Sequence, residues 1–318
     1  MSKTFQKMSQ YDFCQDKKIR NITCLITLKN NFIACSFNTK IQIFNNILNS
    51  RLTIKEHQSD INHIFQMKNG NMISSSGIIK IITFEDNYKN YKVIQIFKDN
   101  TDAICKTIEL STSHLVSVSR DGTMKCYMKS IEDKNEYFLF KINKRVFDGV
   151  TLGNIYEIPE KGQFFVNSGV RVHFQPKIFD SMTCDYIRTF KYNVISYYYC
   201  KNIYLYLGED KLAIGQHSLI IVFDIKNDTI IGKYLYTGSE TDCYINVLAR
   251  FKKEYLLSGS DDGDIELWKI NNDYTLMKKS YFKNVHKQMI FSIVVIDEKK
   301  DTIASCGGDG KIVIMRYI

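Results

Sequence analysis

The sequence predicts an all-β fold, a single seven-bladed β-propeller of four-stranded antiparallel blades over residues 1–318. Three observations predict it. A β-hairpin pattern recurs along the chain, the closing residues of successive copies are 40 to 52 residues apart, and further strand-like runs flank each copy. A period of about 40–45 residues with four strands per unit is typical of propeller blades.

The clearest copy of the hairpin is YLLSGSDDGDIELWKI, residues 255–270. An apolar run ends in small residues, a turn rich in Asp and Gly follows, and an alternating run closes on an aromatic residue. Residues 114–129 (HLVSVSRDGTMKCYMK) and 302–317 (TIASCGGDGKIVIMRY) repeat this pattern. Weaker copies stand at residues 32–45, 71–86 and 211–225, and the fourth copy has a longer loop between residues 163–168 and 177–190. The closing residues are Phe44, Phe84, Tyr127, Phe179, Phe223, Trp268 and Met315.

These hairpins resemble the repeats of the WD-repeat family. SGSDDGDIELWKI is similar to the second strand, turn and third strand of that family, with Leu267–Trp268–Lys269 in place of the terminal Trp-Asp. Phe179–Asp180 resembles the Trp-Asp dipeptide, and Glu56–His57 and Val285–His286 resemble the Gly-His that opens a blade. The resemblance covers nearly the whole chain and implies a non-catalytic platform that other proteins bind.

The last hairpin ends the chain on a third strand, at Met315–Ile318, so the seventh blade lacks an outer strand. Residues Lys3 to Tyr11 precede the first complete unit, and we expect them to supply it, which would remove an exposed sheet edge. The alternative is a targeting peptide, because this stretch has Lys3 and Lys7 and no acidic residue before Asp12.

The nine cysteines show no Cys-x-x-Cys pair, and several, such as Cys35 and Cys306, lie inside apolar runs. We expect free, buried thiols in a reducing compartment, the cytoplasm, with the nucleus and the mitochondrion left open. No apolar run approaches the roughly 20 residues that a membrane span needs. The sequence therefore predicts a soluble protein.

His286, Ser305 and Asp309 are the residue types of a catalytic triad. The family resemblance implies a structural role instead, in which they form an internal hydrogen-bonded network with a third-strand aromatic residue, whose place Met315 takes. His57, Asp121, Asp262 and Trp268 belong to the same structural set in other blades. We therefore expect no enzyme.

The acidic run around Asp261, Asp262 and Asp264 lacks the ligand spacing of an EF-hand, and no phosphate-binding loop occurs. We expect no metal and no cofactor. We define the top face as the side that carries the hairpin turns and the crossovers between blades. Its loops hold more acidic residues than basic ones, whereas lysines such as Lys68, Lys92, Lys252 and Lys300 are assigned to the opposite side.

The favoured function is a scaffold subunit of a larger complex, with a partner peptide or domain docked on the top face. The residues chosen for this contact are the charged non-turn positions of that face, Asp60, Asp102, Arg120, Arg145, Glu240, Asp242, Asp261 and Lys287. The alternative is a nucleic-acid-associated subunit of a ribonucleoprotein particle, which would use the basic side. The net charge of +9 permits it, although no strip of alternating aromatic and basic residues occurs. The oligomeric state stays open.

Overall fold

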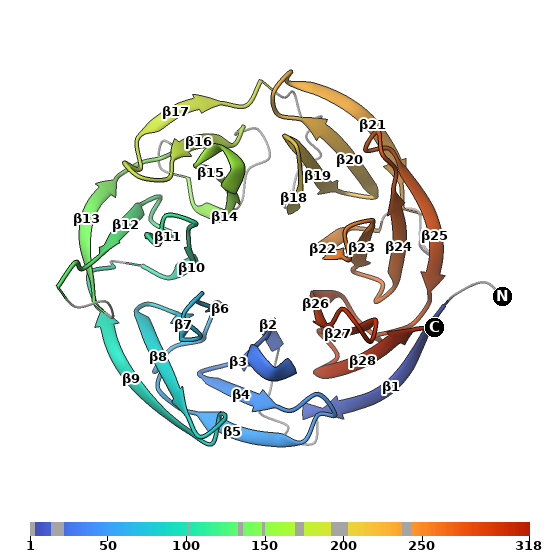
Figure 1. Cartoon of the computed structure of the whole chain (residues 1–318), viewed down its shortest axis with the longest axis horizontal. Helices are drawn as coiled ribbons and strands as arrows, with labels where there is room; N and C mark the ends of the chain where they lie inside the picture. Colours follow the sequence, from blue (N-terminus) through green and yellow to red (C-terminus); the bar gives the residue numbers. More distant parts are fainter. Residues whose placement is uncertain are drawn as a thin grey trace. The chain divides into compact units, whose positions relative to one another are not determined.

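The computed structural model describes residues 4–13, 22–100, 102–132, 136–147, 150–168, 175–191, 203–236 and 243–318. Its strands form seven four-stranded sheets, shown in Figure 1, in which the paired strands run antiparallel. Six sheets take their strands in chain order, and the seventh adds the N-terminal strand to three C-terminal ones. The chain is therefore a seven-bladed β-propeller, as the sequence predicts.

The contacts within the chain divide it into two compact units, and unit 1 comprises Met1–Glu56 and Asn202–Ile318. It holds the first, fifth, sixth and seventh blades. Their strands are β2 (Ile22–Thr27), β3 (Ile33–Phe37), β4 (Lys40–Phe44) and β5 (Ser50–Ile54); β18 (Ile203–Gly208), β19 (Lys211–Gln216), β20 (Leu219–Asp224) and β21 (Thr229–Leu235); β22 (Ile245–Phe251), β23 (Tyr255–Ser260), β24 (Ile265–Ile270) and β25 (Leu276–Phe282); and β26 (Ile290–Asp297), β27 (Thr302–Gly307), β28 (Lys311–Tyr317) and β1 (Phe5–Asp12). A 3₁₀ turn, η2 (Lys29–Asn31), lies between β2 and β3.

Unit 2 comprises His57–Lys201 and holds the second, third and fourth blades. Their strands are β6 (His63–Gln66), β7 (Met72–Ser75), β8 (Ile79–Glu85) and β9 (Asn90–Phe97); β10 (Ile104–Glu109), β11 (Leu115–Ser119), β12 (Met124–Lys129) and β13 (Tyr137–Asn143); and β14 (Leu152–Ile158), β15 (Gln163–Ser168), β16 (Lys177–Asp180) and β17 (Tyr186–Thr189). A 3₁₀ turn, η3 (Pro159–Lys161), joins β14 to β15. The prediction of one domain over the whole chain stays a prediction.

Burial within each blade follows the sequence pattern. The second strands read as continuous runs of small and apolar residues, and β3, β11 and β27 are buried along their whole length. The fourth strands are the most accessible, and most of their residues are exposed or half-buried, as in β21 and β5. The hydrophobic effect therefore holds the middle of each blade between its neighbours, whereas each outer strand meets solvent.

The seventh blade is completed by β1, which pairs with β28 from Phe5 opposite Tyr317 to Asp12 opposite Lys311. The ring of Phe5 packs against Phe251, Phe282 and Tyr317, with centroids 5.0 to 5.5 Å apart. The prediction that the N-terminal residues form this outer strand is confirmed, with bounds one or two residues later than expected.

Within each unit, consecutive blades pack through their first strands. In unit 1, β18 contacts β22, β22 contacts β26, and β26 contacts β2. In unit 2, β10 contacts both β6 and β14. This arrangement places the hairpin turns of neighbouring blades next to one another on the top face of each unit, where they are available to form a site.

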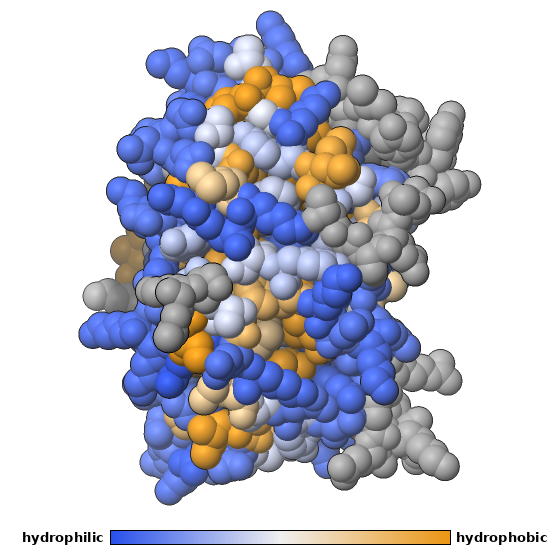
Figure 2. All heavy atoms as spheres, turned by 90° about the vertical axis from the view of Figure 1, so that its right-hand side faces the viewer, coloured by the Kyte–Doolittle hydropathy of each residue, from blue (hydrophilic) through white to orange (hydrophobic). Residues whose placement is uncertain are grey.

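The surface of unit 1 on the side that carries β25 is mainly hydrophilic, and its hydrophobic side chains form separate patches (Figure 2). Among the described residues, no helix has the length and apolar character to cross a membrane. Lys92, which the sequence places in a loop opposite the top face, lies instead in the outer strand β9.

Candidate functional site

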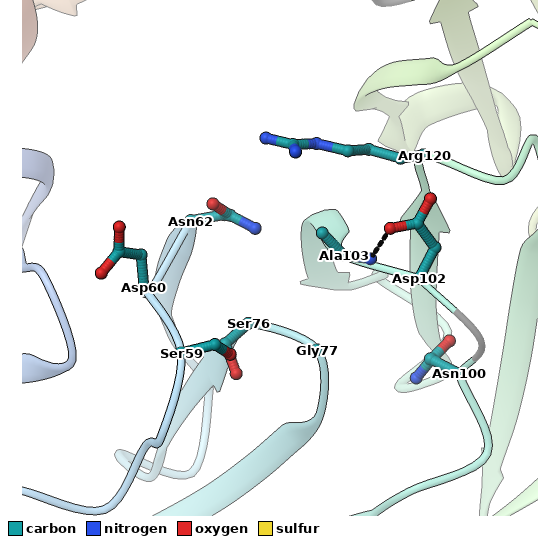
Figure 3. A pocket seen from close by; sticks show the side chains of 9 residues that line it. All are labelled: Ser59, Asp60, Asn62, Ser76, Gly77, Asn100, Asp102, Ala103 and Arg120. Atoms are coloured by element: carbon teal, nitrogen blue, oxygen red, sulfur yellow. Dashed lines mark hydrogen bonds between the residues drawn. The ribbon is translucent and has the colours of Figure 1, made fainter.

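A pocket of about 460 Å³ opens on the top face of unit 2, between the second and third blades (Figure 3). The crossovers into the two blades and the hairpin turns β7–β8 and β11–β12 form its walls. The lining residues are Ser59, Asp60, Asn62, Ser76, Gly77, Asn100, Asp102, Ala103 and Arg120. Three of the eight residues chosen from the sequence for partner contact, Asp60, Asp102 and Arg120, therefore lie around one pocket.

His57 holds the wall of the second blade. Its Nδ1 lies 2.8 Å from Ser76 Oγ, its Nε2 lies 2.7 Å from Ser74 Oγ, and the side chain is buried. Because buried polar groups need partners, these two bonds fix the crossover against the β7–β8 hairpin. The sequence identifies His57 but misses Ser76, which occupies a turn that has no acidic residue.

Hydrogen bonds also join the two blades beneath the pocket. Asn62 donates its backbone N–H to Ser75 O (2.9 Å) and its Nδ2 to Ile104 O (2.9 Å). In the other direction, the N–H of Ile104 donates to Ser76 O at 2.7 Å. The side-chain amide of Asn62 and the main-chain N–H of Ile104 thus join the two blades, and this limits how far the pocket walls can move apart.

The wall of the third blade is built around Ala103. Its carbonyl oxygen accepts the backbone N–H of Arg120 (3.0 Å) and the Ser119 hydroxyl (3.2 Å), and its N–H donates to Asp102 Oδ1 (2.6 Å). Asp121 Oδ1 in turn accepts the backbone N–H (2.9 Å) and the hydroxyl (2.6 Å) of Thr123. Asp121 is therefore a turn-holding residue, and the turn presents Arg120 at the pocket.

The side chains of Asp60, Asp102 and Arg120 are exposed. Within the described part of the chain, neither Asp60 nor Arg120 has a side-chain hydrogen bond or an ion pair. Figure 3 shows Arg120 reaching across the pocket, with Asp60 and Asp102 on opposite walls. Charged groups with unused hydrogen-bonding capacity, mounted on a rigid wall, are suited to binding charged or polar groups of a partner.

The other residues chosen for partner contact are not part of this pocket. Arg145 is exposed in the crossover into the fourth blade, and Lys287 is exposed in the crossover into the seventh. Asp261 begins the β23–β24 turn. Glu240 and Asp242 lie outside the described residues. The expectation that Arg120 and Asp261 occupy non-turn positions is wrong, since each is the first residue of a hairpin turn.

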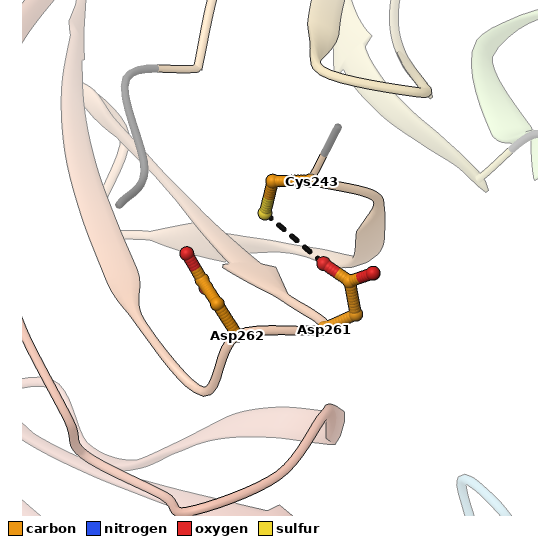
Figure 4. Close-up of side chains that lie close together, drawn as sticks. All are labelled: Cys243, Asp261 and Asp262. Carbon is orange, nitrogen blue, oxygen red and sulfur yellow. Dashed lines mark hydrogen bonds between the residues drawn. The ribbon is translucent and has the colours of Figure 1, made fainter. Parts of the chain in front are cut away.

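Asp261 is also committed to its own blade. Its Oδ1 accepts the backbone N–H of Tyr244 at 2.8 Å and lies 3.1 Å from Cys243 Sγ, a bond drawn in Figure 4. The carboxylate therefore ties the crossover into the sixth blade to the hairpin turn. The partner-contact role of Asp261 stays a prediction, and replacing this residue would also leave the N–H of Tyr244 without its acceptor.

Cys243, Asp261 and Asp262 form a potential metal-ligand set, since their ligand atoms lie within 4.8 Å of one another. Burial and the hydrogen bond to Asp261 raise the pKa of the Cys243 thiol. The thiol therefore stays protonated and donates a hydrogen bond to Asp261. Asp262 Oδ1 accepts the Ser260 hydroxyl and the backbone N–H of Asp264. Both carboxylates thus bind groups of the fold itself.

The seventh blade brings His286, Ser305 and Asp309 together. His286 Nδ1 lies 2.9 Å from Asp309 Oδ1, and its Nε2 lies 2.9 Å from Ser305 Oγ. Burial would raise the pKa of Asp309, but the hydrogen bonds from His286 and from the N–H of Lys287 outweigh it and lower the pKa. These are the contacts of a catalytic triad, yet Ser305 is fully buried, so its hydroxyl cannot meet a substrate.

The same network reaches the neighbouring sixth blade. The backbone N–H of His286 donates to Gly263 O at 3.0 Å. Gly263 has φ +84°, and a Cβ at this position would lie 2.1 Å from His286 O. Only glycine fits this turn, because both the backbone conformation and the close approach exclude a side chain.

In the sixth blade, Trp268 Nε1 donates to Ser258 Oγ at 3.0 Å. No histidine opens this blade, and the hydroxyl of buried Tyr236 lies 2.8 Å from Ser260 Oγ in that role. Tyr236 is not among the residues identified from the sequence. The only sequence signal for Tyr236 is that it directly follows the outer strand β21. The histidine of the seventh blade, His286, lies a few residues after the outer strand β25.

The chain matches no protein-family model and no curated protein. The features that bear on function are therefore the propeller and the geometry of its top face.

Proposed function

We propose that the chain is a non-catalytic protein-interaction scaffold of the WD-repeat type, a subunit of a larger complex in a reducing compartment such as the cytoplasm. The observation that supports this most is the pocket of unit 2, where Asp60, Asp102 and Arg120 stand on walls held by main-chain hydrogen bonds. Loops on a rigid propeller are a common means of choosing partners.

The pocket suits a partner segment that carries both signs of charge. A lysine or arginine of the partner would lie between Asp60 and Asp102, and a carboxylate or carbonyl oxygen would meet Arg120. Charge-assisted hydrogen bonds of this kind give specificity as well as affinity. The seven cysteines in the described part of the chain are free thiols, which supports a reducing compartment.

The test is affinity purification of the tagged full chain from its own cells, with identification of bound proteins by mass spectrometry. We expect the double variant Asp60→Ala/Arg120→Ala to lose the partner set that the unchanged chain retains. Neither side chain bonds to the described residues, so the melting temperature should stay within about 2 °C of the parent.

Lys287→Ala is the matched control, because Lys287 is an exposed charge of the top face that does not line the pocket. It should keep the whole partner set. Retention of the set by Asp60→Ala/Arg120→Ala would refute the pocket as the docking site. Loss of the set on nuclease treatment of the unchanged chain would favour the nucleic-acid alternative.

A further inference from the structure

Exposed apolar side chains concentrate on one hairpin of the third blade. Of the sixteen large apolar side chains exposed among the described residues, five belong to residues 124–143. They are Met128, Ile131, Phe138, Leu139 and Ile142, with exposed fractions from 37% to 94%. Single exposed apolar residues are ordinary on a protein surface, but a group this dense on one hairpin marks an interaction surface.

The hairpin ends in an open sheet edge. β13 is the outermost strand of the third blade, and no strand of the described chain pairs with its outer side (Figure 1). Gln95 of the second blade binds the backbone of Tyr137, donating to its carbonyl oxygen (2.5 Å) and accepting its N–H (2.9 Å). The backbone edge from Phe138 to Ile142 therefore has no partner strand in the described chain, and such an edge is a template for another strand.

Among the other outer strands of the described chain, β17 has no exposed basic side chain, since Arg188 is half-buried. The remaining five carry exposed basic side chains, which discourage strand pairing along their own edges. These side chains are Lys7 on β1, Arg51 on β5, Lys92 on β9, Lys233 on β21 and Lys279 on β25. The single lysine of β13, Lys141, is half-buried instead, and it pairs with Asp185 and donates to Thr183 O of the fourth blade. β13 therefore lacks the protection that these five outer strands have.

The charges at the two ends of β13 indicate what covers it. Exposed Glu132 and Glu136 precede the strand, and exposed Lys144 and Arg145 follow it. When two copies of β13 lie antiparallel across a two-fold axis, the acidic end of each meets the basic end of the other. A two-fold interface requires this kind of self-complementarity.

We propose that β13 is the homodimer interface of this chain. Two copies pair edge to edge and antiparallel, so that Phe138, Leu139 and Ile142 of one copy pack against the same residues of the other. Glu136 of each copy then lies near Lys144 of its counterpart. This surface is separate from the pocket of the proposed function, and either could fail without the other.

The test measures the dimer dissociation constant of the full chain by sedimentation equilibrium. We expect a concentration-dependent dimer, and we expect Phe138→Lys to weaken it about tenfold or more, because a charge would be placed in the apolar centre. Met277→Lys is the control, since Met277 is a comparably exposed apolar residue on the outer strand β25. It should leave the dissociation constant unchanged.

A charge swap tests the orientation. Glu136→Lys alone should raise the dissociation constant about two- to fivefold, and adding Lys144→Glu should restore it, because the pair is re-formed with its signs exchanged. A chain that stays monomeric at every concentration would overturn the proposal. So would a dimer that Phe138→Lys weakens no more than Met277→Lys, or one whose charge swap gives no recovery.

Discussion

His57 and His286 each bridge a blade crossover and a hairpin with both ring nitrogens, but their partners differ. His286 bonds to a serine and an aspartate, whereas His57 bonds to two serines. In the sixth blade the hydroxyl of Tyr236 takes over the contact to the hairpin. What the fold needs at this position is a buried polar group with a satisfied bond, and several residue types can supply it.

The residue with the clearest single contribution to stability is Trp268. Replacing it by alanine removes a large buried side chain and the donor to Ser258, and should lower the free energy of unfolding by about 3–5 kcal/mol. Trp268→Phe is the control, because it keeps much of the packing and loses the donor, at a cost of about 1–3 kcal/mol. Denaturant unfolding measures both, and an unchanged midpoint in Trp268→Ala would contradict the hairpin assignment.

Asp224 should make stability depend on pH. Burial would raise the pKa of this carboxyl, but hydrogen bonds from the backbone of Asn227 and from Lys211 (3.1 Å) outweigh burial and lower the pKa from 3.8. A pKa lowered by folding stabilises the fold above pH 3.8, and this stabilisation is lost as the pH falls through the folded-state value.

We therefore expect Asp224→Asn to be less stable than the parent at neutral pH, with a difference that shrinks as the pH falls below 3.8. The measurement is denaturant unfolding of both proteins across that range. Asp60→Asn is the control, since the Asp60 carboxylate makes no bond to the described residues. A difference that stays constant or grows on acidification would contradict the assignment.

At the scale of elements, the strand β1 shows how much one segment can matter. It supplies the outer strand of the seventh blade, and Phe5 packs among three aromatic rings. Phe5→Ala should cost about 3–5 kcal/mol of unfolding free energy, since it leaves a cavity in a buried aromatic cluster. Met8→Ala, on the same strand and half exposed, should cost far less. Equal effects in thermal unfolding would mean that β1 does not stabilise the blade.

The strands could be predicted because their pattern is local. Each hairpin carries its own small residues and turn, and six of the seven close on an aromatic residue, so even the degenerate copies are found by comparison within the chain. The partners of the polar side chains could not be predicted in the same way. Ser76 and Tyr236 act across a crossover, on groups 19 and 24 residues away in the chain, and no fixed spacing marks them.

The candidate site was predictable only in part, for a related reason. Asp60, Asp102 and Arg120 could be assigned to the top face, but a pocket depends on how two crossovers and two turns are held by main-chain bonds. The position of a charge in the sequence also does not show whether the fold uses it. Asp261 and Asp60 look alike as exposed acids, yet one binds Tyr244 and the other binds nothing among the described residues.

At the scale of the whole molecule, the question is whether the net charge of +9 is available to nucleic acid. Several lysines assigned to the basic side are already paired. Lys68 donates to the carbonyl oxygens of Leu110 and Ser111, at 3.0 Å each. In unit 1, Lys252 lies 2.5 Å from Asp301, and Lys300 lies 3.8 Å from Asp297. Lys252 and Lys300 are thus paired with carboxylates, and Lys68 is held by carbonyl oxygens, so these side chains offer a phosphate backbone less than the sequence suggests.

We therefore expect the chain to bind a single-stranded RNA of mixed sequence only weakly, with a dissociation constant no tighter than about 10⁻⁶ M at physiological salt. The measurement is fluorescence anisotropy of the labelled RNA over a range of salt concentrations. A protein that uses a dedicated basic surface would bind more tightly, and its affinity would fall steeply with salt, because each neutralised phosphate releases counterions. The contradicting outcome is tight, salt-dependent binding of the RNA that is abolished by substituting Lys68 and Lys252 but not by substituting Asp60 and Arg120. That result would place the functional surface on the side opposite the pocket.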